Sequence, residues 1–184
     1  MNRIQALELL ESHLKNKNLF KHCLAVEAIM IALANHFNEN VDDWALAGLL
    51  HDIDYEQTMD NPEKHSLIGS DILKENGLSD EIVESVKTHN EMHGLKPESL
   101  MAKSLFACDP ISGLIIAAAL VLPSKKLNEL KTSSIVKRFK QKAFARGANR
   151  EIISQCKDLL GLNLEKFSEI SLKALQGISN DLGL

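Results

Sequence analysis

The sequence from Trp44 to Asp54 reads WALAGLLHDID, an apolar stretch that runs straight into a histidine–aspartate doublet. Its helical pattern would carry His51 and Asp52 toward the protein interior. Burying an unpaired aspartate among leucines would cost several kcal/mol, and a bound cation is one of the few partners that offset this cost. The stretch therefore favours a helical fold with buried metal ligands, although an exposed helix end with a capping role would also explain the doublet taken alone.

Apolar residues recur at helical spacing along the rest of the chain as well, for instance at Ile4, Leu7 and Leu10. No stretch shows the sustained period-two alternation and β-branched enrichment of a strand. The sequence therefore predicts an all-α fold, a helical bundle in one domain over residues 1–184. We expect helices over residues 3–16, 19–37, 42–52, 63–76, 79–90, 98–109, 111–122, 124–131, 133–146, 149–160 and 164–181.

Prolines and glycines mark where these helices should end. Pro110 falls between two apolar periodic segments, and Gly77 follows another as a C-terminal glycine would. Only residues 53–61, a run of mostly polar side chains, resemble a true loop. We divide the expected domain into a core over residues 20–122 and a C-terminal helical extension over residues 123–184.

The composition is that of an ordinary globular protein. The chain has 184 residues, of which 45% are hydrophobic, 25% are charged and only 4% are aromatic. Leucine, alanine and isoleucine must therefore supply the core. The formal net charge of -4 gives no global attraction for nucleic acid or anionic lipid. We therefore expect a phosphorylated small molecule as the partner and no nucleic acid polymer, and the sequence leaves a homo-oligomer open.

A cytoplasmic location is expected from the cysteines and the apolar runs. Cys23, Cys108 and Cys156 lie far apart and show no paired metal-type spacing, which is typical of reduced thiols. The longest apolar run, residues 111–122, has about a dozen residues, well short of the roughly 20 that span a bilayer. The N-terminal residues pass directly into a helical pattern without a secretory leader. These features predict a soluble protein with no membrane partner.

Four further side chains with ligand chemistry stand near the ends of expected helices: His22, His65, His89 and Asp109. The last of them would close its helix just before Pro110. Imidazoles and carboxylates together suit Fe, Mn, Co, Ni or Zn, and mixed nitrogen and oxygen ligation leaves positions for water and substrate oxygens. With the doublet, these residues form a candidate metal site.

The order of these residues resembles that of the HD-domain superfamily of metal-dependent phosphohydrolases. The family pattern is a histidine, then a histidine–aspartate doublet, then a distant aspartate, which match His22, residues 51–52 and Asp109. The resemblance extends to small HD or HDIG-type members that hold two metals. Those members add two histidines, at positions that His65 and His89 match here. The resemblance covers about residues 20 to 122.

The resemblance implies a ligand set for one or two divalent transition-metal ions. One ion would take His22, His51 and Asp109, the other would take His65 and His89, and Asp52 would bridge them. Two ions about 3.5–4 Å apart would lower the pKa of a bridging water and neutralise charge on phosphoryl oxygens. Asp52 is therefore also the expected catalytic residue.

The sequence departs from one subgroup of this superfamily. Members that cleave cyclic dinucleotides usually follow the doublet with Ile-Gly-Lys and carry His-His-Glu downstream. This chain has Ile-Asp-Tyr at residues 53–55 and His-Asn-Glu at residues 89–91. A cyclic-di-GMP phosphodiesterase is therefore disfavoured. The arrangement is more similar to the small two-metal hydrolases of nucleotides and dinucleoside polyphosphates.

Three side chains close to the pattern each have two interpretations. Asp54 and Glu56 would orient a ligand histidine or a metal-bound water, or they are loop acids that favour turns and solubility. His93 lies one helical turn after His89 and would serve as an extra ligand if the helix continued. Gly94 indicates that the helix stops, which favours an exposed turn histidine.

A basic segment follows the expected core. Residues 125–150 contain nine lysines or arginines and a single acid, Glu129. Apolar residues interleave at helical spacing, so the segment is either an amphipathic helix with a solvated basic face or a source of phosphate-binding side chains. If any of it reaches the site, Lys142 and Arg146, near the glycine break at Gly147, are the expected substrate-binding residues.

Three functions follow from these patterns. The first is a metal-dependent phosphohydrolase that acts on a nucleotide, a dinucleoside polyphosphate or another phosphorylated small molecule through a metal-activated water. The second is a di-iron HD-fold oxygenase, which would use the same ligand set. The third is a non-catalytic HD signalling module, a class that has lost its ligands. Because every ligand type is retained here, the first function is our prediction.

Overall fold

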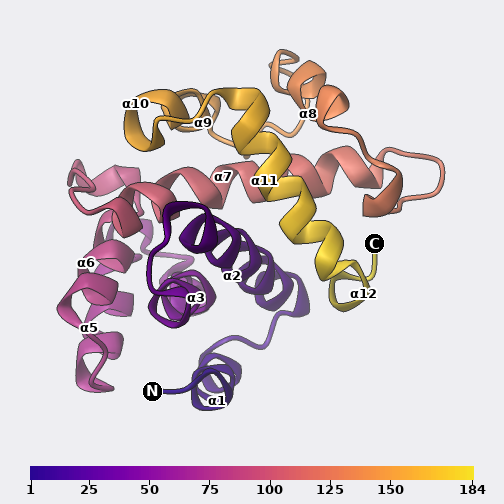
Figure 1. Ribbon diagram of the computed structural model, residues 1–184. Helices are drawn as coiled ribbons and strands as arrows, with labels where there is room; N and C mark the ends of the chain where they lie inside the picture. The colour runs from indigo at the N-terminus through magenta and orange to yellow at the C-terminus, as the bar shows by residue number, and fades with distance from the viewer.

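The computed structural model describes residues 1–184 and contains only helices and their connections (Figure 1). Its two longest helices, α2 (Lys17–Phe37) and α7 (Leu100–Leu120), pack against each other. Fully buried leucine, isoleucine and alanine side chains from both helices belong to one continuous hydrophobic core. The predicted all-α fold class is therefore confirmed.

Shorter helices surround this central pair (Figure 1). They are α1 (Arg3–His13), α3 (Val41–Leu50), α4 (Tyr55–Thr58), α5 (Leu67–Glu75), α6 (Asp80–Thr88), α8 (Thr132–Phe139), α9 (Arg150–Ser154), α10 (Cys156–Leu160), α11 (Leu164–Gly177) and α12 (Ser179–Leu182). Three single-turn 3₁₀ helices complete the chain: η1 (Pro62–Lys64), η2 (Glu91–His93) and η3 (Leu127–Glu129). Helix α3 packs on α2 and α6 on α7, while α11 contacts α2, α7 and α8.

Asparagine caps set the start of the two helices that carry the first histidines of the pattern. The Asn16 side chain accepts from backbone N–H groups at the start of α2, and Asn40 does the same for α3. Such caps satisfy donors that the first helical turn leaves unpaired. They place His22 in the second turn of α2 and leave His51 at the end of α3.

Helices α2 and α3 approach each other closely at Gly48. A β-carbon at this position would lie 2.8 Å from Glu27 Cα and 3.0 Å from the Glu27 backbone nitrogen. Because the obstacle is backbone, it cannot rotate away. We expect Gly48→Ala to lower the free energy of unfolding by about 1–3 kcal/mol, the usual cost of overpacking, measured by chemical denaturation.

Gly113 in α7 provides the matched control. A β-carbon there would meet no atom within 4 Å. Gly113→Ala should therefore raise the free energy of unfolding by about 0.5–1 kcal/mol, because alanine loses less conformational entropy in a helix than glycine. Equal effects of the two substitutions would contradict a close approach at Gly48.

Helix α7 is longer than the sequence predicts. The expected helices 98–109 and 111–122 are one continuous helix with Pro110 inside it, so Asp109 lies in mid-helix and does not close a helix. A proline in a helix interior costs about 3 kcal/mol, because it removes one hydrogen bond and crowds the preceding turn. Residues on both sides of it, Ala107 and Ile111 among them, are fully buried. Their burial outweighs the cost.

Helices α2 and α7 also have the length and apolar character of membrane-crossing segments. The core helices of soluble proteins share this length and apolar character. Of the most apolar 18-residue stretch of each helix, 67% is buried inside the protein in α7 and 44% in α2. Two such helices are therefore weak grounds for a membrane span.

Several other expected elements differ from the structure. Residues 53–61 contain a short helix, α4, and are not entirely loop. The expected helix 63–76 is interrupted, and α5 begins only at Leu67. The expected helix 124–131 is reduced to η3, and the expected helix 149–160 breaks at Gln155 into α9 and α10.

The expected helix 133–146 ends early, at Phe139. Residues 140–149 form a loop instead. Arg150 favours this loop, because its guanidinium group binds the carbonyl oxygens of Phe139 and Gln141, which would accept hydrogen bonds inside the expected helix.

Candidate metal centre

The six ligand-type residues converge at one place in the fold, around Asp52. The Oδ1 atom of Asp52 lies 3.4 Å from His51 Nε2, 3.3 Å from His65 Nε2 and 3.4 Å from His89 Nε2. Its other oxygen, Oδ2, lies 3.6 Å from His22 Nε2. Elements distant in sequence, from α2 to the end of α6, therefore bring their side chains to a single carboxylate.

Backbone carbonyl groups fix the orientation of two of these imidazoles. His51 Nδ1 lies 2.9 Å from the Gly48 carbonyl oxygen, and His89 Nδ1 lies 2.6 Å from that of Val86. Because a carbonyl oxygen can only accept, each Nδ1 must carry the proton. The Nε2 atoms of both residues therefore present a lone pair to Asp52.

Asp54 fixes the orientation of His65. Its Oδ1 lies 2.8 Å from His65 Nδ1, while its Oδ2 accepts from the backbone N–H groups of Ser66 at 2.8 Å and Gly69 at 2.7 Å. The Asp54 carboxylate is fully buried and so caps the start of α5 from a different part of the chain.

This contact also explains why His65 does not begin a helix. Ser66 has a left-handed backbone conformation, with φ of 71°, which separates η1 from α5. The turn lets His65 face Asp52 through Nε2 and Asp54 through Nδ1. A β-carbon on Gly69 would lie 3.2 Å from the Asp54 carboxylate, so glycine leaves room for the cap.

His22 and Asp109 form the third side of the cluster. His22 Nε2 lies 3.0 Å from Asp109 Oδ1, and its Nδ1 lies 3.2 Å from the Ser112 hydroxyl oxygen. The Ser112 hydroxyl donates to the Asp109 carbonyl at 2.8 Å, so Nδ1 of His22 is the donor in the contact between them. Again Nε2 is the atom that faces the carboxylates.

The cluster requires positive charge. Burial alone would lower the pKa of His22, but the hydrogen bond with Asp109 and the charges of Asp109 and Asp52 raise it to about 9. Burial likewise opposes protonation of His65, yet Asp52 and Asp54 raise its pKa to about 10. Without a cation, protons must therefore supply the charge that the buried carboxylates need.

Burial and neighbouring groups also determine the pKa values of His51 and Asp52. Burial lowers the pKa of His51 to about 4, so this imidazole stays neutral. Burial would raise the pKa of Asp52, but the hydrogen bonds with His65 and His89 and the charge of His22 hold it well below its usual range. A neutral donor beside an ionised carboxylate is the state in which both bind metals.

The donor atoms fall into two groups that each suit one divalent metal ion. His22, His51 and Asp52 form the first, and Asp52, His65 and His89 form the second, with the donor atoms of each group within 4.8 Å of one another. His89 Nε2 is buried and has no hydrogen-bond partner. A cation would satisfy this orphaned lone pair, so the residues fit a metal centre in which Asp52 is shared.

Other side chains of the expected pattern lie outside the cluster. Glu56 accepts from the backbone N–H groups of Lys15 and Asn16 and so braces the connection between α1 and α2. His93 is half-buried and donates from Nε2 to the His65 carbonyl at 2.7 Å, so it is not a simple exposed turn residue. Gly94 ends η2 after it, with φ of 63°.

The cluster opens into a cavity of about 300 Å³. A second cavity of about 240 Å³ shares with it the side of the site formed by His22, His89 and Asp109. A third, of about 860 Å³, contains the predicted substrate residues Lys142 and Arg146. All three are lined by Glu91 and Gly147, so the basic residues lie in a space that adjoins the metal centre and not among the ligands.

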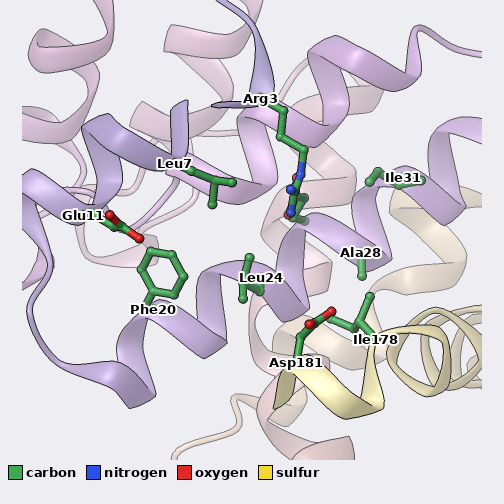
Figure 2. A pocket seen from close by; sticks show the side chains of 10 residues that line it. Arg3, Leu7, Glu11, Phe20, Leu24, Ala28, Ile31, Ile178 and Asp181 are labelled. Carbon is green, nitrogen blue, oxygen red and sulfur yellow. The ribbon is translucent and has the colours of Figure 1, made fainter. Parts of the chain in front are cut away.

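A separate cavity of about 500 Å³ lies between α1, α2 and the C-terminal turn (Figure 2). Its wall is formed by apolar side chains such as Leu7, Phe20 and Ile178. The one basic side chain of this cavity, Arg3, is neutralised, because its Nε and Nη2 donate to both carboxylate oxygens of the buried Glu27. The acidic side chains that line this cavity form no group that could hold a metal ion, so the cluster around Asp52 is the candidate site.

Comparison with known proteins bears on the family. The HD domain matches residues 19–119, more than half of the chain. Ribonuclease Y of Lawsonia intracellularis is 30% identical over 139 residues, which are 74% of this chain and 26% of that protein. Ribonuclease Y of Geobacter sulfurreducens is 29% identical over 140 residues, again 74% of this chain and 26% of that protein. Ribonuclease Y of Pelobacter propionicus is 33% identical over 97 residues, 53% of this chain and 18% of that protein.

These relatives correct one expectation from the sequence. The exclusion of nucleic acid polymers as partners is wrong, because the matched relatives are named ribonucleases. The chain spans about a quarter of the length of the first curated relatives it matches. No solved structure matches the chain. The family and the relatives together suggest a hydrolase.

Proposed function

We propose a metal-dependent phosphohydrolase, starting from the fact that this chain belongs to the HD-domain family. Its reaction would be the hydrolysis of a phosphoester or phosphoanhydride bond in a substrate of nucleotide type. A segment of RNA is included among these substrates, because the relatives are ribonucleases by name. Mononucleotides and dinucleoside polyphosphates remain in the proposal as smaller substrates with the same chemistry.

One observation carries this proposal: two groups of histidine donors share a single buried carboxylate. Nitrogen and carboxylate donors in this mixture suit Fe, Mn, Co, Ni or Zn. Two divalent ions bound there would lower the pKa of a water and neutralise charge on the phosphoryl oxygens. The residues that would hold them are His22, His51, Asp52, His65, His89 and Asp109.

The protein's own side chains prepare this site. Asp54 keeps the proton of His65 on Nδ1, and the carbonyl groups of Gly48 and Val86 do the same for His51 and His89. Each imidazole therefore offers Nε2 without a rearrangement, which reduces the free-energy cost of ligand binding. Asp54 is thus proposed as a positioning residue that acts through His65.

The wall of the cavity limits what can enter. Leu19 and Tyr55 line one part of it, and Tyr55 stacks edge-on against His65 with ring centroids 5.2 Å apart. Lys142 and Arg146 stand in the adjoining cavity, where they would attract the anionic part of a substrate. We propose them as substrate-binding residues.

The proposed function predicts metal-dependent turnover. Protein freed of metal with a chelator should be inactive, and reloading with Mn²⁺, Fe²⁺, Co²⁺, Ni²⁺ or Zn²⁺ should restore hydrolysis for at least one ion. The assay follows release of phosphate or shorter products from mononucleotides, dinucleoside polyphosphates and short single-stranded RNA. Metal content is determined on the same samples.

The outcome that would overturn the proposal is equally specific. Protein that carries its full metal content and hydrolyses no member of the panel is not a phosphohydrolase of this class. Oxygen consumption by the iron-loaded sample, measured with an oxygen electrode, would then identify the oxygenase alternative.

A further inference from the structure

Arg150 is committed entirely to the shape of the loop before it. Its Nε donates to the Phe139 carbonyl, its Nη1 to those of Ala145 and Ala148, and its Nη2 to those of Gln141 and Phe144. Four of these carbonyl groups lie in the loop, and the fifth belongs to the last residue of α8. A guanidinium group has five N–H donors, so these contacts use all of them. The residue therefore holds residues 140–149 in one conformation and has no donor left for a substrate.

The loop held by Arg150 lies against the metal centre. Gly147 lines the cavity around Asp52 and also the two cavities that adjoin it. Asn149 donates from Nδ2 to Glu91 Oε1 at 3.0 Å, and Glu91 follows soon after the ligand His89. The Asn149 side chain thus attaches the C-terminal end of the loop to the chain beside a metal ligand.

This arrangement gathers unpaired positive charge next to the site. Lys140, Lys142 and Arg146 are exposed, line the cavity of about 860 Å³, and form none of the protein's salt bridges. The two acids of the cavity wall are Glu91, whose carboxylate already accepts from Asn149, and Glu151. The wall therefore carries a net positive charge although the whole chain is acidic.

Backbone strain indicates that the loop conformation is held against a cost. Ala145 has φ of 44°, a left-handed value that costs a residue with a β-carbon about 1–2 kcal/mol. Its carbonyl is one of those that Arg150 binds. A solvated basic face would need neither the strain nor a dedicated arginine, because an amphipathic helix presents lysines equally well.

We propose that the loop of residues 140–149 is a second phosphate-binding site, which holds a phosphate of the substrate other than the one at the metal centre. This inference rests on the proposed function and adds a substrate class to it. The substrate would carry two or more phosphates in a chain, either as phosphodiesters or as a polyphosphate. Lys142 and Arg146 would hold the outer phosphate, while the metal centre holds the reacting one.

The test measures binding, so that it does not depend on turnover. Manganese-loaded protein is titrated calorimetrically with orthophosphate, with a methylene-bridged tripolyphosphate that resists hydrolysis and with a single-stranded pentaribonucleotide that has phosphorothioate linkages. The variant is Lys142→Ala with Arg146→Ala. The matched control is Lys126→Ala with Lys131→Ala, which removes the same charge from exposed positions of the basic segment outside all three cavities.

We expect the wild-type protein to bind at least one of the longer probes more tightly than orthophosphate. The Lys142 and Arg146 variant should bind that probe about tenfold or more weakly, with a shallower salt dependence, because charged contacts to phosphate release counterions. Binding of orthophosphate should change less than about twofold, because the metal centre is intact. The probe that loses affinity identifies the phosphodiester or the polyphosphate as the source of the second phosphate.

Three results would overturn the second site: longer probes that bind no more tightly than orthophosphate, equal losses for all probes, or equal losses in the control variant. Failure of the proposed function has a different signature. In that case the second site would still bind the longer probe, but no probe with ordinary linkages would be hydrolysed by the metal-loaded protein.

Discussion

Replacing Asp52 with asparagine should remove metal binding at both donor groups and reduce turnover by about 10³-fold or more. Asp52 is the only residue common to the two groups, and three imidazole nitrogens lie within 3.4 Å of one of its oxygens. Asparagine keeps the shape of the side chain but lacks the charge that a cation needs. Metal content by mass spectrometry and steady-state kinetics on the best substrate would measure both losses.

Two other aspartate-to-asparagine substitutions provide a comparison for the loss of metal binding. Asp109→Asn should weaken metal binding less than Asp52→Asn, because Asp109 contacts only His22 in the cluster. Asp60→Asn, on an exposed loop acid, should leave metal content and kinetics unchanged. If Asp52→Asn retained the metal content of the wild-type protein, the shared carboxylate would have no role in binding cations. Circular dichroism would check that each variant is folded.

Helical periodicity was sufficient to predict the fold class, because each buried helix presents its apolar residues at a regular spacing. It also helped to identify the ligand-type residues, because histidines and aspartates near the ends of expected helices are easily recognised beside apolar segments. It failed where a distant residue decides the local structure. Residues 140–146 have a helical pattern, but the side chain of Arg150 binds the Phe139 and Gln141 carbonyl groups that this helix would use.

Pro110 shows a second limit of local rules. Its ring should end a helix, yet α7 continues through it. The helix continues because apolar side chains from both halves of α7 are buried against other helices. The sequence around the proline does not show this burial. A sequence pattern gives the local cost of such a residue, and only the packed structure gives the compensation.

Charge shows a third limit. The net charge of -4 argues against nucleic acid partners, but it averages over a chain in which residues 125–150 hold nine cations and one acid. Binding of an anionic chain depends on the charge within about one Debye length of the contact, roughly 8–10 Å. The local surplus beside the metal centre is therefore the relevant quantity, and the fold determines where that surplus lies.

Replacing Asp54 with asparagine should displace the proton of His65 and weaken metal binding at the group formed by Asp52, His65 and His89. The carboxylate accepts three N–H groups, one at Oδ1 and two at Oδ2. An amide has only one oxygen. If that oxygen remains with Ser66 and Gly69, the amide N–H₂ faces His65 Nδ1 and favours the tautomer with its proton on Nε2, the atom that should bind the metal.

We expect the affinity for metal to fall by about 10–100-fold in this variant, as is typical when a partner of a ligand histidine is lost. Titration against a chromophoric chelator measures the affinity. Nitrogen-15 NMR of histidine side chains gives the tautomer of His65 directly, a signal that general destabilisation would not shift from Nδ1–H to Nε2–H. Both measurements should change together.

Glu56→Gln is the matched control, because Glu56 lies two residues further along the chain and accepts from Lys15 and Asn16, away from the ligands. It should leave the metal affinity within about twofold of the wild-type value, since no ligand nitrogen depends on it. Asp54→Ala should instead destabilise the fold by at least about 1–3 kcal/mol, because buried N–H groups would lose their acceptor. Wild-type affinity in Asp54→Asn, with the His65 proton still on Nδ1, would show that Asp54 does not position the histidine.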